Sequence, residues 1–196
     1  MPKTCAEPIL QREMTPTPVI RINRAPVLTL WASIVARRSG YGEEEALTLG
    51  RAIAGLTAQS KGRRLGIYAP GSEASRKRVI TQREEMGAGS VAFMGRELPC
   101  VRTELGLRAL SGGSPIEPES VRAYLSSRFK DHLSVVEAQL TALATAFDPA
   151  ELETRAMDLY MRFRPEVPKG EAGWGRMGLL DLDKVAGLAE EGRAAG

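Results

Sequence analysis

"RAPVLTLWASIVARRSGYGEEEALTLGRAIAGLTAQSKGRR", residues 24–64, contains two helical patterns separated by a short glycine turn. In the first pattern, large apolar side chains recur at helical spacing: Val27, Trp31, Ile34 and Val35. Gly40 ends this pattern, so we expect a helix over residues 26–39. In the second, residues 43–64 begin with three glutamates and end with three cations, an order that complements the dipole of one helix. The stretch therefore predicts a tight helical hairpin.

The second helix of the hairpin is rich in small residues: Gly50, Ala52, Ala54 and Gly55. Two glycines in a helix cost roughly 2 kcal/mol of helix propensity relative to alanine. Close approach by another helix is the expected compensation, because a missing Cβ lets two backbones come together. We therefore expect the two helices to pack through these residues.

The middle of the chain changes character twice. Residues 72–86 predict a polar, exposed helix whose apolar content is too thin for burial. After it, short apolar runs separated by Gly95 and Gly106 predict a small β-meander. Pro99 lacks a backbone N–H, so the middle run is expected at an edge of the sheet or in a bulge.

The C-terminal part is helical again. Large apolar side chains follow one another three or four residues apart and form one seam for packing against another helix: Leu125, Phe129, Leu133, Val136, Leu140, Leu143 and Phe147. The direction of this seam is expected to break near Lys130. As part of the core, the seam needs no further partner. The alternative is that it pairs with its own copy in a helical homodimer.

Two further helices complete the C-terminal part. Asp148 as cap, Pro149 at the first helical position and Glu151 reaching back indicate the start of one helix. Its inner face is expected to consist of Leu152, Ala156, Leu159, Tyr160 and Phe163. A loop of about fifteen residues follows, and Asp181 or Asp183 caps the last helix.

Together these patterns predict a predominantly α-helical α+β protein with an N-terminal helical hairpin, a small central β-meander and a C-terminal helical group. Residues 1–18 hold four prolines and no periodicity, so a flexible arm is expected there. A short strand is expected in VIRI, residues 19–22. Residues 19–110 hold the basic hairpin and the β element, and residues 115–196 hold the C-terminal helices. The two parts are expected to pack as one globular unit.

The composition excludes several classes of protein. With 43% hydrophobic and 26% charged residues among 196, the chain belongs with ordinary soluble globular proteins. Its two cysteines, Cys5 and Cys100, are far apart and exclude a disulfide framework. The first twenty residues lack the apolar core of a signal peptide, and the longest apolar stretch is about half a membrane span. We expect a cytoplasmic protein of bacterial type without a membrane partner.

A glycine motif near the C-terminus suggests a cofactor loop. Gly173, Gly175 and Gly178 fit the G-x-G-x-x-G spacing of dinucleotide-binding proteins. No strand pattern precedes them, however, and the 18 residues after Gly178 are too few for the rest of a Rossmann unit. We therefore interpret the stretch as a loop in which Trp174 packs on the helical body, and no cofactor is predicted.

Residues for catalysis are scarce. His132 is the only histidine in the sequence, which excludes catalytic triads and metal sites that need several histidines. Glu84 and Glu85 are adjacent and point in different directions on a helix, so they do not form an acid–base pair. No catalytic or metal-binding residue is predicted. An enzyme that uses carboxylates and arginines in a cleft between the two halves is the third of three functional hypotheses.

A DNA-reading helix-turn-helix is another candidate, because Ala36 and Gly40 match the small residue and the glycine of its turn. The second helix of the hairpin would then read DNA, and it begins with Glu43, Glu44 and Glu45. Three carboxylates at this place would repel DNA, which disfavours a conventional major-groove reader.

Positive charge is concentrated in the first part of the chain. Residues 1–116 hold 17 Lys and Arg against 10 Asp and Glu, whereas residues 117–196 hold 10 against 14. Three clusters lie at expected helix ends or in loops: Arg37 and Arg38; Lys61, Arg63 and Arg64; and Arg76, Lys77 and Arg78. Mobile side chains at such places can meet phosphates, and Tyr41 and Tyr68 are close enough in sequence to stack on bases. The plain alternative is a set of solvated helix ends, where cations complement the dipole.

The leading hypothesis is a non-enzymatic binding or regulatory protein that contacts nucleic acid, or another polyanion, through these eight cations. The alternative is a protein–protein interaction module, or a self-assembling helical protein, whose cationic and anionic parts complement each other. The choice depends on whether the three clusters form one patch, which sequence spacing does not decide.

Overall fold

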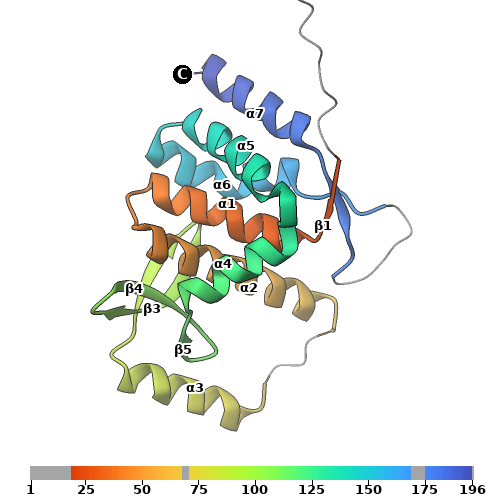
Figure 1. The fold of residues 1–196 in the computed structure, drawn as a ribbon. Helices are drawn as coiled ribbons and strands as arrows, with labels where there is room; N and C mark the ends of the chain where they lie inside the picture. Colours follow the sequence, from red (N-terminus) through yellow and green to blue (C-terminus); the bar gives the residue numbers. More distant parts are fainter. Residues whose placement is uncertain (1–18, 68–70, 169–174, 196) are drawn as a thin grey trace, which may run out of the picture.

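The computed structural model of the protein describes residues 19–67, 71–168 and 175–195. In these ranges the chain is predominantly helical with two small antiparallel sheets, which confirms the predicted α+β class (Figure 1). The elements follow in the order β1 (Ile20–Ile22), α1 (Arg24–Arg38), α2 (Glu43–Arg64), α3 (Glu73–Glu85), β2 (Gly89–Phe93), β3 (Arg96–Thr103), β4 (Gly106–Ser111), β5 (Ser114–Pro115), α4 (Pro118–Phe129), the short 3-10 helix η1 (Lys130–His132), α5 (Leu133–Thr145), α6 (Pro149–Phe163), β6 (Gly178–Leu180) and α7 (Leu182–Ala195). The predicted arm over residues 1–18 lies outside the described residues, as do Tyr68 and Trp174.

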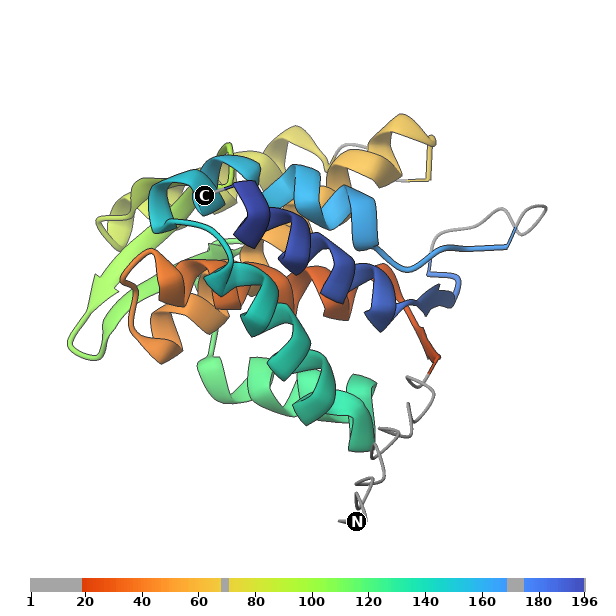
Figure 2. The ribbon, with the colours of Figure 1, turned by 90° about the horizontal axis from the view of Figure 1, so that it is seen from above.

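Helix α1 lies at the centre of the helical part and packs against α2, α4, α5 and α6 (Figure 2). The Asn23 side chain caps it by accepting a hydrogen bond from the backbone N–H of Ala25 at 3.0 Å. All of residues 26–36 are buried, whereas the sequence predicted one apolar stripe. The hydroxyls of Thr29 and Ser33 tolerate this burial because each donates to the backbone carbonyl four residues earlier.

Helices α1 and α2 form the predicted hairpin, and α2 has the predicted bounds. Gly50 is the point of close approach. A Cβ added there would lie 2.5 Å from the carbonyl oxygen of Thr29 and closer still to the hydroxyl of Ser33. At Gly55, by contrast, an added Cβ would meet nothing within 4 Å. The prediction of packing through small residues is therefore right for the first glycine and wrong for the second, which faces open space.

Strands β2 to β5 form the predicted antiparallel meander, in sequence order. Strand β3 lies between β2 and β4, so the middle run is not an edge strand. Its pairing with β4 begins only at Cys100, which lies opposite Ala109, while Pro99 is paired with Ser90 of β2 alone. The proline therefore lies just beyond the second ladder, where its missing N–H leaves no hydrogen bond unmade.

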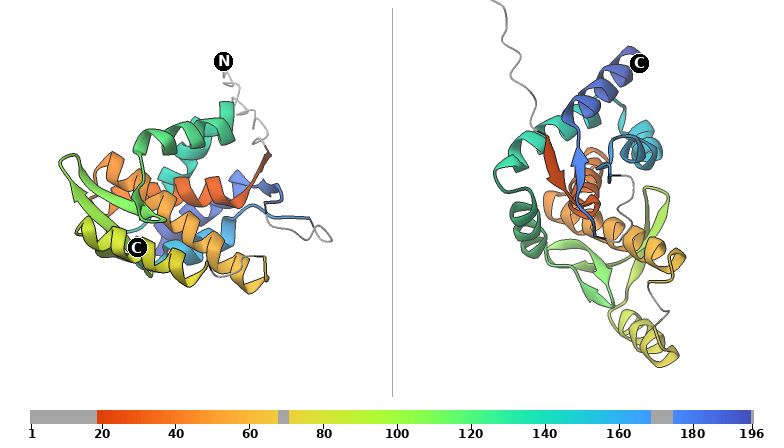
Figure 3. Two further views of the ribbon diagram at one scale, coloured as in Figure 1. Left: turned by 90° about the horizontal axis from the view of Figure 1, so that it is seen from below. Right: turned by 90° about the vertical axis from the view of Figure 1, so that its right-hand side faces the viewer.

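Helix α3 lies at the end of the molecule opposite to α7, next to the small sheet (Figures 1 and 3). Among its residues none is buried, in agreement with the predicted polar helix over residues 72–86. Ser72 caps it by accepting from the backbone N–H of Ser75 at 3.2 Å. Helix α3 therefore contributes no buried side chain to the core.

The apolar seam of the C-terminal part is divided between α4 and α5. Lys130 has a positive φ of 51° and starts the short turn η1, so the seam changes direction at the predicted residue. Its large side chains are buried within the chain, with Leu133 half-buried: Leu125, Phe129, Val136, Leu140, Leu143 and Phe147. The seam therefore serves as core, as the first of the two interpretations expects.

Helix α6 begins at Pro149 and buries the five side chains predicted for its inner face. The prediction of a capping box at this helix is wrong. Asp148 occupies the cap position, but its side chain makes no capping hydrogen bond. The Glu151 carboxylate pairs with Arg155, one turn further along the helix, at 2.6 Å instead of reaching back. An ion pair at this spacing competes directly with the capping box for the same carboxylate.

The predicted strand in residues 19–22 finds a partner that the sequence did not indicate. Strand β1 pairs antiparallel with β6, which begins at Gly178, the last residue of the stretch predicted as a loop. Gly178 opens this strand and not a helix, and an added Cβ there would lie 2.9 Å from Pro165. Gly178 therefore marks a tight backbone crossing, and Gly173, the first glycine of the motif, lies outside the described residues. Asp181, the first of the two predicted caps, accepts from the N–H groups of Asp183 and Lys184 at 3.0 and 3.2 Å and begins α7.

Candidate functional site

The first predicted cluster, Arg37 and Arg38, is bound within the fold. Nη2 of Arg37 donates to the carboxylate of Glu137 at 2.8 Å, and Nη2 of Arg38 donates to the carbonyl of Phe147 at 3.3 Å. Both residues lie at the start of the hairpin turn, whereas Lys61 lies 18 residues beyond Glu43, about 27 Å along α2. The structure does not bring this cluster together with the other two.

The cations of the other two predicted clusters lie on consecutive helices, α2 and α3. Arg63 and Arg64 are exposed in the last turn of α2, and within the described residues neither makes an ion pair. Three more are exposed on α3: Arg76, Lys77 and Arg78. Of these, Arg76 donates from Nε to the carbonyl of Gly71 at 3.0 Å. These five side chains stay accessible to an anionic partner.

Lys61 differs from its neighbours because it is half-buried and faces other cations. A hollow of about 100 Å³ between α1, α2 and α6 is lined by Lys61, Arg24, Arg164 and Arg176, and no acidic side chain is among its described lining residues. Burial lowers the pKa of Lys61, and the positive charges of Arg24 and Arg164 lower it further. Like charges thus converge on a lining without a described acid, although Nε of Arg24 donates to the carbonyl of Pro165 at 2.9 Å and the Glu166 carboxylate, outside the lining, also acts on Arg24.

The other polar groups of this hollow leave it without a negative charge. The hydroxyl of Tyr160 donates to the carbonyl of Arg24 at 3.1 Å, and burial raises the pKa of this tyrosine far above its ordinary value. It therefore stays neutral at physiological pH. Oγ1 of Thr57, also in the lining, has no hydrogen-bond partner within the described part of the chain. A ligand oxygen or a water is the natural partner for it.

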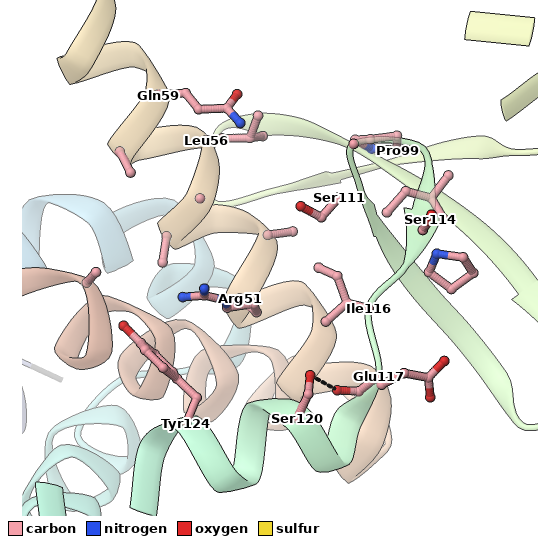
Figure 4. A pocket seen from close by; sticks show the side chains of 18 of the residues that line it. Arg51, Leu56, Gln59, Pro99, Ser111, Ser114, Ile116, Glu117, Ser120 and Tyr124 are labelled. Atoms are coloured by element: carbon pink, nitrogen blue, oxygen red, sulfur yellow. Dashed lines mark hydrogen bonds between the residues drawn. The ribbon is translucent and has the colours of Figure 1, made fainter. Parts of the chain in front are cut away.

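A larger cavity of about 670 Å³ continues from this hollow along α2 (Figure 4). It lies between α2, the turn from β4 to β5, and the start of α4. The two share Asn23, Ala25, Ala54, Ala58 and Gly175 in their linings, so they form one continuous depression. We call the hollow and the cavity together the α2 groove.

The cavity end of the α2 groove also holds cations that form no ion pair with a described acid. The guanidinium carbons of Arg51 and Arg128 lie 4.3 and 5.6 Å from the ring centroid of Tyr124. Arg83 lines the same cavity, and its buried Nε has no hydrogen-bond partner among the described residues. Glu117 is the one acid of the described lining, and its side chain points away from the cavity (Figure 4).

Sequence reasoning identified only Lys61 among the cations of the α2 groove. The others are isolated in the sequence and come from separate elements: Arg24, Arg51, Arg83, Arg128, Arg164 and Arg176. A positive charge beside small residues in the middle of a helix, as at Arg51, was the available signal. The three glutamates at the start of α2 are used inside the fold, since Glu43 pairs with Arg122, Glu44 with Arg108, and Glu45 binds the backbone of β4.

Comparison with models of known protein families, with curated proteins and with solved structures gives no match. In the described ranges, no helix has the length and apolar character needed to span a bilayer.

Proposed function

We propose that this chain is a non-enzymatic nucleic-acid-binding protein whose α2 groove holds the phosphates of its ligand. The observation that carries this proposal is the convergence of Lys61, Arg24 and Arg164 on a hollow lined by no described acidic residue. Surface cations are usually matched by nearby acids or spread in solvent. A cluster that lowers the pKa of its own lysine is unfavourable in the free protein and is relieved by a bound anion.

The length of the α2 groove favours an extended polyanion over a single phosphate. Arg51 and Lys61 face it from the same helix, ten residues and therefore about 15 Å apart. At about 3.4 Å of axis per nucleotide, this distance corresponds to roughly four nucleotides of a strand. The exposed cations beyond the end of α2, Arg63 and Arg64, extend the positive surface further.

The two alternative functions have less support from the geometry. Self-assembly through the apolar seam lacks a free surface, because the large side chains of the seam are buried in the chain. An enzyme that pairs carboxylates with arginines needs an acid that faces the cavity. Glu117, the acid in the described lining of the cavity, points away from it (Figure 4).

The proposal is tested by fluorescence anisotropy with labelled DNA and RNA oligonucleotides at several salt concentrations. The variant Lys61→Gln/Arg164→Gln is expected to weaken binding by at least about tenfold, and to reduce the slope of log K against log salt by about 1.4. The matched control is Arg37→Gln/Arg162→Gln, which removes two charges that are paired with Glu137 and Glu191. A third variant reverses the charge at the surface residues Arg63, Arg64, Arg76 and Lys77, and it is also expected to bind weakly.

Three results would overturn the proposal, and two of them concern affinity. One is the absence of binding to any DNA or RNA at low salt. The other is an equal loss of affinity in the groove variant and in its control, which would mean that only net charge matters. Binding that does not change with salt would contradict it as well, because phosphate contacts release counterions.

A further inference from the structure

We propose that the cavity between α2 and α4 holds one unpaired nucleotide, so that the protein binds single strands or strand ends in preference to duplex. This inference rests on the proposed function and specifies the class of ligand. Its chemical core is a flat base beside a phosphate, which is found both in a strand and in a free nucleoside monophosphate.

The size of the cavity fits a ligand of this kind. Its volume of about 670 Å³ falls within the range of about 300–1,000 Å³ that is usual for small-molecule sites. In a duplex the bases are stacked and paired, so a base enters a protein cavity only when it is unpaired or extruded. A cavity of this volume beside a phosphate-binding groove therefore selects an unpaired nucleotide.

Part of the cavity lining is apolar. Beside Arg51 and Gln59, helix α2 contributes small and aliphatic side chains, and the facing elements add proline and aliphatic residues: Ala52, Ala54, Gly55, Leu56, Pro99, Leu110, Pro115 and Ile116. Ile116 extends into the space between the turn and α2 (Figure 4). A base face is the part of a nucleotide that gains from such a surface.

The rim of the cavity supplies groups for the edge of a base and for its phosphate. Ser111 and Ser114 bring hydroxyls from the turn between β4 and β5, and Gln59 brings an amide from α2 (Figure 4). Arg51 and Arg128 are held against the ring of Tyr124. A guanidinium that is stacked in this way keeps its N–H edge free for the bidentate contact that phosphate prefers.

The continuity of the α2 groove gives the strand a path. When one nucleotide occupies the cavity, the next nucleotide of the strand lies at the residues shared with the hollow, beside Asn23 and Ala58. The next phosphates then reach Lys61, Arg24 and Arg164. Charge alone would serve a duplex equally well, so the cavity is the feature that distinguishes the two ligands.

Gly55→Leu tests the inference without any change of charge. An added side chain at Gly55 projects into open space and fills the cavity, and leucine favours a helix more than glycine does. The matched control is Gly187→Leu on α7, where an added Cβ also meets nothing within 4 Å. Arg51→Gln and Arg51→Lys complete the set, since lysine keeps the charge but not the bidentate contact.

The readouts are the affinities for a single-stranded oligonucleotide, the matching duplex and free adenosine monophosphate, with thermal unfolding as the check on folding. We expect the wild type to prefer the single strand by at least tenfold. Gly55→Leu is expected to remove that preference at an unchanged or higher melting temperature, while Gly187→Leu keeps it. Binding of the free monophosphate that is lost in Gly55→Leu supports the cavity as a nucleotide site independent of a strand.

Equal affinity for single strand and duplex, or an unchanged preference in a folded Gly55→Leu variant, overturns the inference and leaves the proposed function standing. No binding of any oligonucleotide at low salt overturns both. These two failures are therefore distinguishable in one series of measurements.

Discussion

The carboxylate of Glu45 accepts a hydrogen bond from the backbone N–H of Leu107 at 2.8 Å, and this bond ties the start of α2 to β4. Its second oxygen accepts from the backbone N–H of Gly42 at 3.0 Å, which closes the N-terminus of the helix. Both bonds lower the pKa of Glu45, the one from Leu107 most. The glutamates that disfavour a DNA-reading helix thus hold the sheet on the helical part.

Replacement of this carboxylate is expected to destabilise the protein in a pH-dependent way. Glu45→Gln should lower the free energy of unfolding near pH 7 by about 1–2 kcal/mol, because two hydrogen bonds to a charged group are weakened. The folded-state pKa is depressed, so this stabilisation is present above the ordinary glutamate pKa and is lost as the pH falls through the folded value. Urea unfolding of both proteins near neutral pH and well below about pH 4.3 measures the difference.

The control for this experiment is Glu104→Gln, in the exposed turn between β3 and β4, where the carboxylate makes no ion pair within the described structure. It should leave stability nearly unchanged at both pH values. A deficit of Glu45→Gln that stays the same in acid would show that the carboxylate charge contributes nothing.

Gly50 and Gly55 are expected to respond to the same substitution with opposite signs. Gly50→Ala places a Cβ 2.5 Å from the carbonyl oxygen of Thr29, so α1 and α2 must separate, and we expect a loss of about 3 kcal/mol. Gly55→Ala meets open space and should gain up to about 1 kcal/mol from helix propensity. Chemical denaturation of the two variants is a matched comparison on one helix, and shifts of the same sign would contradict the packing described here.

The fold could be predicted from the sequence wherever its cause is local. Residues 43–64 match α2 at both ends because the acidic start and the basic end lie within the segment and the glycine turn comes directly before it. Strand β6 was missed because it has only three residues, and its partner β1 lies far away in the sequence. The predicted capping role of Glu151 is wrong because its carboxylate fits two local patterns. In the structure it forms the ion pair with Arg155 instead of the capping box.

The candidate site was less predictable because it depends on packing. Adjacent cations such as Arg37 and Arg38 predicted a binding cluster. In the structure, however, Arg37 pairs with Glu137, which lies a hundred residues further along the chain. The cations of the α2 groove come together only when separate elements pack, among them α1, α2 and α4. Lys61 belongs to both sets, and its neighbours Arg24 and Arg164 show no clustering in the sequence.

Cys100 is expected to be unreactive in the folded protein. Its side chain is only 2% exposed, and burial raises its pKa to about 11, so almost no thiolate is present near neutral pH. In a Cys5→Ser background, iodoacetamide should label Cys100 slowly in native buffer and rapidly in denaturant, as mass spectrometry can follow. Complete labelling of the native protein within minutes would mean that the β-meander opens readily.

Removal of the central cation of the α2 groove is expected to leave the free protein at least as stable, although it weakens the response to polyanions. Because Lys61 has a lowered pKa, its own contribution to stability should rise with pH toward its ordinary value of 10.5, while the raised pKa values of Tyr160 and Cys100 act in the opposite direction in wild type and variant alike. Lys61→Gln lacks this rise. At neutral pH and low salt, an oligonucleotide or heparin should raise the melting temperature of the wild type, since a ligand that binds only the folded state stabilises it.

The ligand-induced increase in melting temperature should be clearly smaller in Lys61→Gln than in Lys184→Gln. The latter removes the same charge from an ion pair with Glu166 at 2.8 Å. Differential scanning fluorimetry across a ligand titration compares the three proteins directly. If Lys184→Gln loses as much of the ligand-induced increase as Lys61→Gln, the convergence of Lys61, Arg24 and Arg164 is not what a polyanion recognises. If Lys61→Gln unfolds earlier than the wild type without ligand, the repulsion among these side chains is not the unfavourable feature from which the binding proposal starts.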